Sequence, residues 1–389
     1  MTTSTAEQFR AVRGEFPHTR ELVYFNSASY GPYSTRVQRA LAETIAARVR
    51  SAEDSTASIF AMREALRRDY GALIGARPSQ IGIGLNTTFG LNVAAYGLPL
   101  KKGDEVLLTD VEFPALVYAF RGAAQTRGIT LRFVKTRDRR VDVEQLSRAV
   151  TKRSKVLAIS WVQFFDGYRN DLAALGEFCR DHGLFFVVDG IQGTGMQPLD
   201  VRKLGIDIFS TGCQKWLLAP QGSGFFYIAD RIRDRLQPPS ASWLGVEWHQ
   251  KFGDLFRYDR EFLATAARFE LGYYVELNLA GMRESAAMFR ELGTRNIQRH
   301  TRALIDRLAD YIRGHKFYRI TSSMEPKHRS SIFTFTCDRF RDLHKELYRR
   351  KITCVHREGS IRISVHFFNN EDDIDKLIAV LDRFAESAP

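Results

Sequence analysis

The sequence has few cysteines and no long apolar run. Its 389 residues include four cysteines, which form no C-x-x-C pair and no spacing typical of a metal site. No stretch reaches the roughly 18 apolar residues that a membrane-spanning helix needs, and the polar start MTTSTAEQFRAVRGEF lacks the apolar core of a signal peptide. We therefore expect a cytoplasmic protein with reduced, isolated thiols, no bound metal and no membrane association.

Basic charge is spread along the chain and not concentrated in one segment. The formal net charge is +12, which raises the question of nucleic-acid binding. Short basic clusters lie only at 137–140 and 349–351, and neither carries the interleaved aromatic residues of a single-strand binder. We expect no nucleic-acid partner and interpret the charge as a solvated surface that also attracts small anions.

Short apolar runs alternate with helical patterns in the first two thirds of the chain. Helical spacing is present at 58–74 and 171–182. The expected buried strands are EVLLT (105–109), LRFVK (131–135), KVLAIS (155–160), LFFVVD (184–189), IDIFST (206–211) and GFFYIA (224–229). Continuous apolar strands separated by helices predict an α/β fold with a mostly parallel sheet sandwiched by helices.

A second, smaller unit is expected after the segment QPPSASW (237–243). Long helical patterns at 280–315 are followed by strands near 331–336 and 359–365 and by a final helix at 371–386. Because the chain is too long for a single core, we predict two domains. The large domain covers 15–245, and the smaller α/β domain combines 1–14 with 275–389.

Two charged residues stand at the ends of apolar runs, where ligands bind in an open parallel sheet. Asp189 ends LFFVVD, and Lys215 lies in the turn of IDIFSTGCQKWLLAPQGSGFFYI. A carboxylate at such a place is either a structural cap or the partner of a cation. A lysine between two buried strands is poorly placed to be simply solvated, so the pair is a candidate site.

Two further motifs suit a planar, phosphorylated ligand. In GIGLNTTFGLNVAAYGL, Thr87 and Thr88 precede a helix expected to begin near Phe89, and a helix N-terminus with two hydroxyls can bind phosphate. An ordinary threonine N-cap explains one of the two equally well. In DVEFPALVYAF, Phe113 follows a strand and can either stack on a planar ring or pack in the core.

Together these residues resemble the class V aminotransferase family of pyridoxal-5′-phosphate (PLP) enzymes. The similarity is greatest to the branch with isopenicillin N epimerase and cysteine desulfurase, and it extends from VYFNSASYGP (23–32) to IRISVHFFNNEDDID (361–375). The resemblance implies the fold of PLP-dependent transferases of type I and PLP as cofactor. It also implies a small amino-acid substrate and a homodimer with shared active sites.

The resemblance assigns cofactor-binding roles to the motif residues. Lys215 would hold PLP as a Schiff base and later move protons at the substrate Cα. Asp189 would pair with the ring nitrogen, so that the ring can act as an electron sink. Gln192 would donate a hydrogen bond to the phenolic oxygen of the ring. Thr88 would bind the phosphate, helped by the backbone of Thr87.

The remaining assignments concern the ring face and the substrate. Phe113 would stack on the ring, where many relatives have histidine. Arg362 would bind the substrate α-carboxylate with its planar fork. Ser29 and Tyr30 would line the entrance to the site, and Gln163 in SWVQFFDG is a further polar contact near the ring.

Two positions depart from the family pattern. Gln214 stands before the lysine, where the family usually has histidine, and a glutamine can donate to the cofactor but cannot carry a proton. Tyr273, in ARFELGYY, replaces the threonine that reaches the phosphate of the partner subunit. These changes indicate specialised chemistry and not routine transamination.

Three functions follow as hypotheses. The first is a lyase that cleaves the C–S bond of cysteine or an S-substituted cysteine by β-elimination, because Cys354 lies in an expected strand and turn and is poorly placed to accept sulfur. The second is an aminotransferase or epimerase, with decarboxylation coupled to oxidative deamination as a variant. The third is a PLP-fold binding or regulatory module without turnover.

Overall fold

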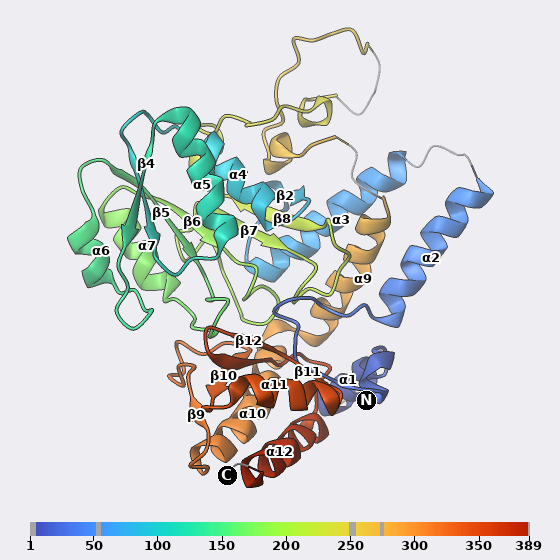
Figure 1. Cartoon of the computed structure of the whole chain (residues 1–389). Coiled ribbons are helices and arrows are strands. Elements are labelled where there is room, and N and C mark those ends of the chain that lie inside the picture. The colour runs from blue at the N-terminus through green and yellow to red at the C-terminus, as the bar shows by residue number, and fades with distance from the viewer. Residues whose placement is uncertain (1–4, 52–55, 249–253, 273–275, 388–389) are drawn as a thin grey trace.

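The chain is built around a seven-stranded sheet (Figure 1). The computed structural model describes residues 5–51, 56–248, 254–272 and 276–387. In sheet order the strands are β2 (Ile81–Gly84), β8 (Gly224–Ile228), β7 (Ile208–Gly212), β6 (Phe185–Asp189), β5 (Ser154–Ser160), β3 (Glu105–Thr109) and β4 (Thr130–Val134). β8 alone runs antiparallel to its neighbours, so the expected mostly parallel sheet is confirmed.

Helices flank this sheet and cover its central strands. Every residue of β2, β3, β7 and β8 is buried, as expected for strands with both faces covered. The helices of this part are α2 (Thr35–Arg50), α3 (Thr56–Ile74), α4 (Thr87–Gly97), α5 (Pro114–Arg127), α6 (Val143–Ala149), α7 (Leu172–Asp181) and α8 (Asp230–Arg233). No helix in the described parts of the chain is long and apolar enough to cross a bilayer.

The sequence analysis missed strand β2. Its sequence, IGIG, alternates isoleucine with glycine and therefore lacks the apolar run that marks the other strands. Gly82 is required there because a Cβ at this position would collide with the ring of Phe226 on the neighbouring strand β8. A contact between two strands far apart in sequence thus explains a composition that does not look like a strand.

A smaller antiparallel sheet lies below the first in Figure 1. Its order is β12 (Val355–Arg357), β13 (Ser360–Ser364), β10 (Ile332–Thr336) and β9 (Arg319–Ile320). The helices beside it are α10 (Thr294–Arg313), α11 (Phe340–Arg349) and α12 (Glu371–Glu386). Residues of both groups form a separate hydrophobic cluster, so this part has a core of its own.

The N-terminal segment joins the two sheets. Strand β1 (Val23–Tyr24) pairs in parallel with β11 (Ile352–Thr353), and Asn26 forms a bridge with Ser364 at the end of β13. The following residues reach the large sheet, because the backbone N–H of Gly31 donates to the carbonyl of Gln214 at 2.9 Å. The segment therefore ties the small sheet to the loop that carries Lys215.

Helices α1 (Thr5–Arg13) and α9 (Glu276–Leu292) bear on the predicted domain boundaries. Phe9 of α1 and Met282 and Phe289 of α9 belong to the hydrophobic cluster of the large sheet. Helix α9 also packs along α2 and α3. The division at 14/15 and 245/275 stays a prediction, and the second boundary falls beside residues outside the described ranges. The remaining short helices are η1 (Pro17–Arg20), η2 (Pro78–Gln80), η3 (Trp243–Gly245) and η4 (Ala266–Phe269).

Candidate functional site

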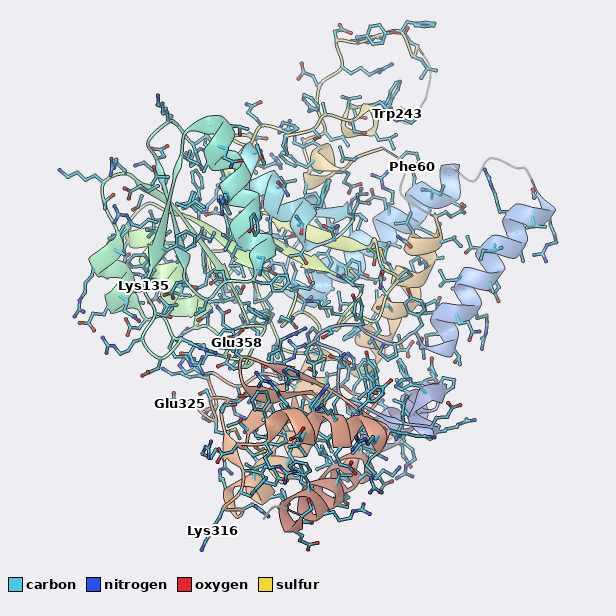
Figure 2. The ribbon with its side chains drawn as sticks, in the orientation of Figure 1. Phe60, Lys135, Trp243, Lys316, Glu325 and Glu358 are labelled. Atoms are coloured by element: carbon cyan, nitrogen blue, oxygen red, sulfur yellow. The ribbon has the colours of Figure 1, made fainter. Side chains whose placement is uncertain are left out.

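The candidate residues of the large sheet gather at one edge. Strands β2, β3, β5, β6 and β7 run in the same direction, so their carboxyl ends meet there. The candidate residues at or just after these ends are, in chain order, Thr87, Phe113, Gln163, Asp189 and Lys215. The small sheet closes over this edge: Glu358, labelled between the two parts in Figure 2, forms an ion pair with Arg139 of the large part at 3.5 Å.

Lys215 occupies the loop between β7 and β8. Burial lowers the pKa of its ammonium group to about 8, opposed by the charge of Asp189 and assisted by Arg362. Its Nζ lies 5.4 Å from the centroid of the Phe113 ring. Phe113 itself is partly exposed and packs edge-on against Phe164 at 5.2 Å. An amine that is partly neutral near pH 7 thus faces an aromatic ring.

Asp189 is the last residue of β6. Its Oδ1 accepts a hydrogen bond from the backbone N–H of Ile191 at 3.0 Å. Burial raises the pKa of its carboxyl to about 6, opposed by that hydrogen bond and by the charge of Lys215. A cation beside this carboxyl would favour its ionised form, as a protonated ring nitrogen does.

Gln192, three residues later, has a fixed side chain. Its Oε1 accepts from the indole N–H of Trp216 at 2.7 Å, and its Nε2 donates to the carbonyl of Ala28 at 3.1 Å. Both Gln192 and Trp216 are buried. One of the two N–H groups of the amide is left for another acceptor.

Helix α4 begins at Thr87, two residues earlier than expected. Asn86 is its N-cap, and the Asn86 Oδ1 accepts from the backbone N–H of Phe89 at 2.9 Å. The cap role considered for a threonine is therefore filled by asparagine. Thr88 is exposed, whereas Thr87 is buried and its Oγ1 has no hydrogen-bond partner among the residues that the structure describes. Both threonines are thus free to contact an anion at the positive end of the helix.

Gln214 and Lys215 are in close contact with the N-terminal segment. A Cβ at Gly31 would collide with the carbonyl oxygen of Lys215, so a glycine is required where the two backbones meet. The side-chain Oε1 of Gln214 is buried, and it has no hydrogen-bond partner within the described ranges. Buried polar atoms are normally paired, so this one is available for a ligand.

Arg362 projects from β13 to the same edge. Its Nη2 donates to the hydroxyl of Ser29 at 2.8 Å and its Nη1 donates to the carbonyl of Phe164 at 2.5 Å. Burial and the charge of Arg357 lower the pKa of its guanidinium to about 10. Among the described residues no carboxylate pairs with Arg362, so the buried fork is available to an anion. Tyr30, next to Ser29, is 58% exposed.

Two site residues were missed by the sequence analysis. Arg357 of β12 stands diagonal to Arg362 on the same face, because Val355 pairs with Arg362 and Arg357 with Ser360. Its charge contributes to lowering the pKa of Lys215. Only the pairing of β12 with β13 could have revealed it, and that pairing is not visible in the sequence.

The second missed residue is Glu112, directly before Phe113. It is buried, which raises the pKa of its carboxyl, and it accepts from Gln163 Nε2 at 3.4 Å and from the backbone N–H of Ser160 at 2.9 Å. Gln163 is thereby held at the site, while its Oε1 has no partner in the described part of the chain. Tyr273 lies outside the described residues.

The arrangement fits the PLP group that the sequence led us to expect. In the parts of the chain that the structure describes, three buried side-chain oxygens without partners lie at one edge of the sheet, on Thr87, Gln163 and Gln214. The same edge offers a helix N-terminus for a phosphate, an aromatic face for a ring, and a buried carboxyl for a ring nitrogen. It also offers an amine of lowered pKa for an aldehyde.

Comparison with known proteins agrees with this reading. The probable cysteine desulfurase of Methanothermobacter thermautotrophicus is 26% identical, over 96% of this chain and 97% of that protein. The isopenicillin N epimerase of Streptomyces clavuligerus is also 26% identical, over 84% of each chain. A solved complex of the cystine C–S lyase C-DES with its product cysteine persulfide has a similar fold, with a TM-score of 0.87 and 22% identity over 96% of this chain and 100% of that one.

The sequence profile of the class V aminotransferases matches residues 23–377, which is nearly the whole chain. The apo structure of a cysteine desulfurase from Thermococcus onnurineus, at 22% identity and a TM-score of 0.86, covers 97% of this chain and 98% of its own, and has the same fold. The predicted fold and family are therefore confirmed. The chain belongs to the class V aminotransferase family, whose members are PLP-dependent enzymes.

Proposed function

We propose that the protein is a PLP-dependent lyase that cleaves the C–S bond of cysteine or of an S-substituted cysteine. The observation that carries the proposal is the burial of every thiol: all four cysteines are buried. Cys354, between β11 and β12, is 7% exposed, and burial raises the pKa of its thiol to about 12. A buried, protonated thiol is a poor acceptor of sulfur, so the sulfur product is expected to leave the protein.

The proposed reaction is a β-elimination followed by hydrolysis. A substrate R–S–CH2–CH(NH3+)–COO− loses the Cα proton, the Cβ–S bond breaks, and the electron pair of that bond leaves with sulfur as a thiol. Water converts the three-carbon remainder to pyruvate and ammonium. The names of two relatives, a cysteine desulfurase and a cystine C–S lyase, support chemistry at a cysteine sulfur.

PLP, when bound, supplies the electron sink that stabilises negative charge at Cα. In this proposal Lys215 binds the cofactor and then, as a free amine of lowered pKa, removes the Cα proton. Asp189 pairs with the ring nitrogen, Phe113 stacks on the ring, and Gln192 donates to the ring oxygen.

Other residues would hold the phosphate and the substrate. The N-terminus of α4, with Thr87 and Thr88, binds the phosphate. Arg362, oriented by Ser29, binds the α-carboxylate. Arg357, which no carboxylate pairs within the described chain, adds a second cation and favours substrates with a second carboxylate, such as cystine.

The test is product formation by purified protein supplied with PLP. We expect cystine and S-methylcysteine to give pyruvate, ammonium and a sulfur product in equal amounts over many turnovers. Lys215→Ala should abolish this, while Lys155→Ala, a surface lysine remote from the site, should not. Absence of both keto acid and released sulfur across S-substituted cysteines would refute the lyase.

Similarity to isopenicillin N epimerase keeps the aminotransferase or epimerase alternative as the second candidate. An aminotransferase requires that the pyridoxamine form of the cofactor accumulate in a single turnover. An epimerase requires that the substrate lose optical activity without being cleaved. Decarboxylation with oxidative deamination would consume dioxygen. Each of these readouts differs from the equal yield of pyruvate and sulfur product.

We further propose that the active enzyme is a homodimer with shared sites. The segment 254–262 extends away from the body of the molecule in Figure 1. It exposes large apolar side chains, with Phe256 85% and Tyr258 86% exposed. Side chains of this size are usually covered, and a second copy of the chain is the expected cover.

A further inference from the structure

A chain of hydrogen bonds links Gln192 to residues with no assigned role. Gln192 accepts from Trp216 and donates to the carbonyl of Ala28, at 2.7 and 3.1 Å. Trp216 in turn contacts His366, which lies two residues after β13 of the small sheet. The Nε2 of His366 lies 2.8 Å from the Trp216 carbonyl oxygen. Three segments distant in sequence thus meet around one amide.

These partners permit only one orientation of the Gln192 amide. An indole N–H can only donate, so the atom facing Trp216 must be the amide oxygen. A carbonyl oxygen can only accept, so the atom facing Ala28 must be the amide nitrogen. A flipped amide would lose both hydrogen bonds in a buried place, which disfavours it strongly. The second N–H of the amide therefore points in one fixed direction.

Trp216 is itself held in place. The backbone N–H of Phe367 donates to His366 Nδ1 at 2.9 Å, so the proton of the neutral ring is on Nε2, which donates to the Trp216 carbonyl. The two rings also stack, with centroids 5.7 Å apart and an interplanar angle of 16°. Burial keeps His366 neutral by lowering its pKa to about 3. Neither ring is free to turn away from the amide.

We propose that Trp216 is a positioning residue: its indole N–H fixes the Gln192 amide so that the remaining N–H donates to the ring oxygen of PLP. This inference rests on the cofactor-binding role proposed for Gln192. It assigns a function to the residue after Lys215, and it explains why that residue is a buried tryptophan with a satisfied nitrogen. Any buried apolar residue would fill the space but would leave the amide oxygen unpaired and the amide held by the Ala28 carbonyl alone.

The experiment is a pH titration of the visible absorbance of the PLP-loaded protein, which does not depend on the reaction catalysed. The absorbance changes when the proton shared by the Lys215 nitrogen and the ring oxygen is lost. This loss leaves the ring oxygen as a free anion, which a donated hydrogen bond stabilises. Trp216→Phe should therefore raise the pH midpoint of the absorbance change by roughly half a unit or more. Gln192→Leu should raise it at least as much. The double variant should equal Gln192→Leu alone, because Trp216 acts through Gln192.

Trp161→Phe is the matched control. Trp161 is also buried and lies near Asp189, but no bond from its indole nitrogen to Gln192 exists in the described chain. Its replacement should leave the midpoint unchanged. An unchanged midpoint in Trp216→Phe, or additive shifts in the double variant, would overturn the inference while leaving the cofactor site intact. Failure of the wild-type protein to bind PLP would instead overturn the proposed function.

If Trp216→Phe does not fold, an isosteric replacement answers the same question. Benzothienylalanine can be incorporated in place of the four tryptophans, and it carries sulfur where the indole has N–H. The ring shape and its stacking on His366 are preserved, while the hydrogen bond to Gln192 is lost. The midpoint should rise as in Trp216→Phe. No change would contradict the proposal.

Discussion

At Lys215 and Asp189, burial acts in opposite directions on two neighbouring side chains. It lowers the pKa of the amine to about 8 and raises the pKa of the carboxyl to about 6. In each case the charged form is disfavoured by loss of water, and the mutual attraction of the two groups only partly compensates. Both groups therefore titrate close to neutral pH, where a proton can be exchanged readily.

The first prediction concerns the pH dependence of cofactor attachment. Only the neutral amine of Lys215 can attack an aldehyde, and a pKa near 8 leaves about a tenth of it neutral at pH 7. The rate of covalent PLP attachment to the cofactor-free protein should rise with pH to a half-maximum near 8. Stopped-flow absorbance between pH 6 and 11 measures it. A half-maximum above pH 10, the range of an ordinary lysine, would contradict the environment described for Lys215.

The second prediction concerns Arg362 as the carboxylate site. Arg362→Lys keeps the charge but loses the planar fork, and Arg362→Met loses both. We expect kcat/KM for S-substituted cysteines to fall by roughly tenfold to a hundredfold in the lysine variant and further in the methionine variant. PLP content, measured by absorbance, should stay at the wild-type level in both. Equal kcat/KM in wild type and Arg362→Met would show that the substrate carboxylate binds elsewhere.

At the scale of elements, the active-site edge depends on the meeting of the N-terminal segment with the lysine loop. Gly31→Ala places a Cβ against the carbonyl of Lys215, so the segment must shift and carry Ser29 away from Arg362. We expect a stability loss of about 1–3 kcal/mol and at least a tenfold weaker binding of PLP. Chemical unfolding and equilibrium dialysis measure the two quantities.

Gly314→Ala is the matched control for that variant. Gly314 ends α10 with a φ of −75°, and a Cβ there meets only ordinary contacts, the nearest at 3.6 Å. This change should leave PLP affinity unchanged. Wild-type affinity in Gly31→Ala as well would mean that the segment does not determine the geometry of the site.

The elements with buried apolar runs could be predicted from the sequence, because a strand that is buried on both faces has an uninterrupted run of apolar residues. Strand β6 ends at Asp189 as expected, and α12 spans 371–386 as predicted. Strand β2 could not be predicted, since the identity of Gly82 is set by Phe226 on another strand. The start of α4 was misplaced because the cap is Asn86 and not a threonine.

For the site, too, the sequence predicts the residues beside apolar runs but not those placed by tertiary contacts. Asp189 and Lys215 stand beside recognisable runs, so their proximity follows from the rule that ligands bind at the carboxyl ends of strands. Glu112 and Trp216 contact partners far away in the sequence, whereas Arg357 is brought beside Arg362 by the pairing of two short strands. Pairwise tertiary contacts, and not composition, decide these positions.

At the scale of the whole molecule, the site is assembled from both sheets. The large sheet supplies Lys215 and Asp189, the small sheet supplies Arg362, and the N-terminal segment joins them through Ser29. A relative movement of the two parts would change the distance between the Lys215 amine and the Arg362 guanidinium. Substrate binding is therefore expected to favour one arrangement of the two sheets.

The oligomeric state is the prediction that belongs to this scale. The chain has a mass of 44.4 kDa, and we expect the purified protein to have twice that mass by light scattering. If the sites are shared between two chains as proposed, replacing the exposed Phe256 and Tyr258 by serine should weaken the dimer and lower activity together. Full activity at the mass of a single chain would contradict the shared site.

The most direct test of the lyase is the identity of its three-carbon product. Uniformly carbon-13-labelled cysteine, mixed with the PLP-loaded protein and followed by NMR, should give labelled pyruvate in both the wild type and Cys354→Ala. Labelled alanine, with sulfur retained on the protein and lost in Cys354→Ala, would contradict the account and identify a desulfurase that uses Cys354.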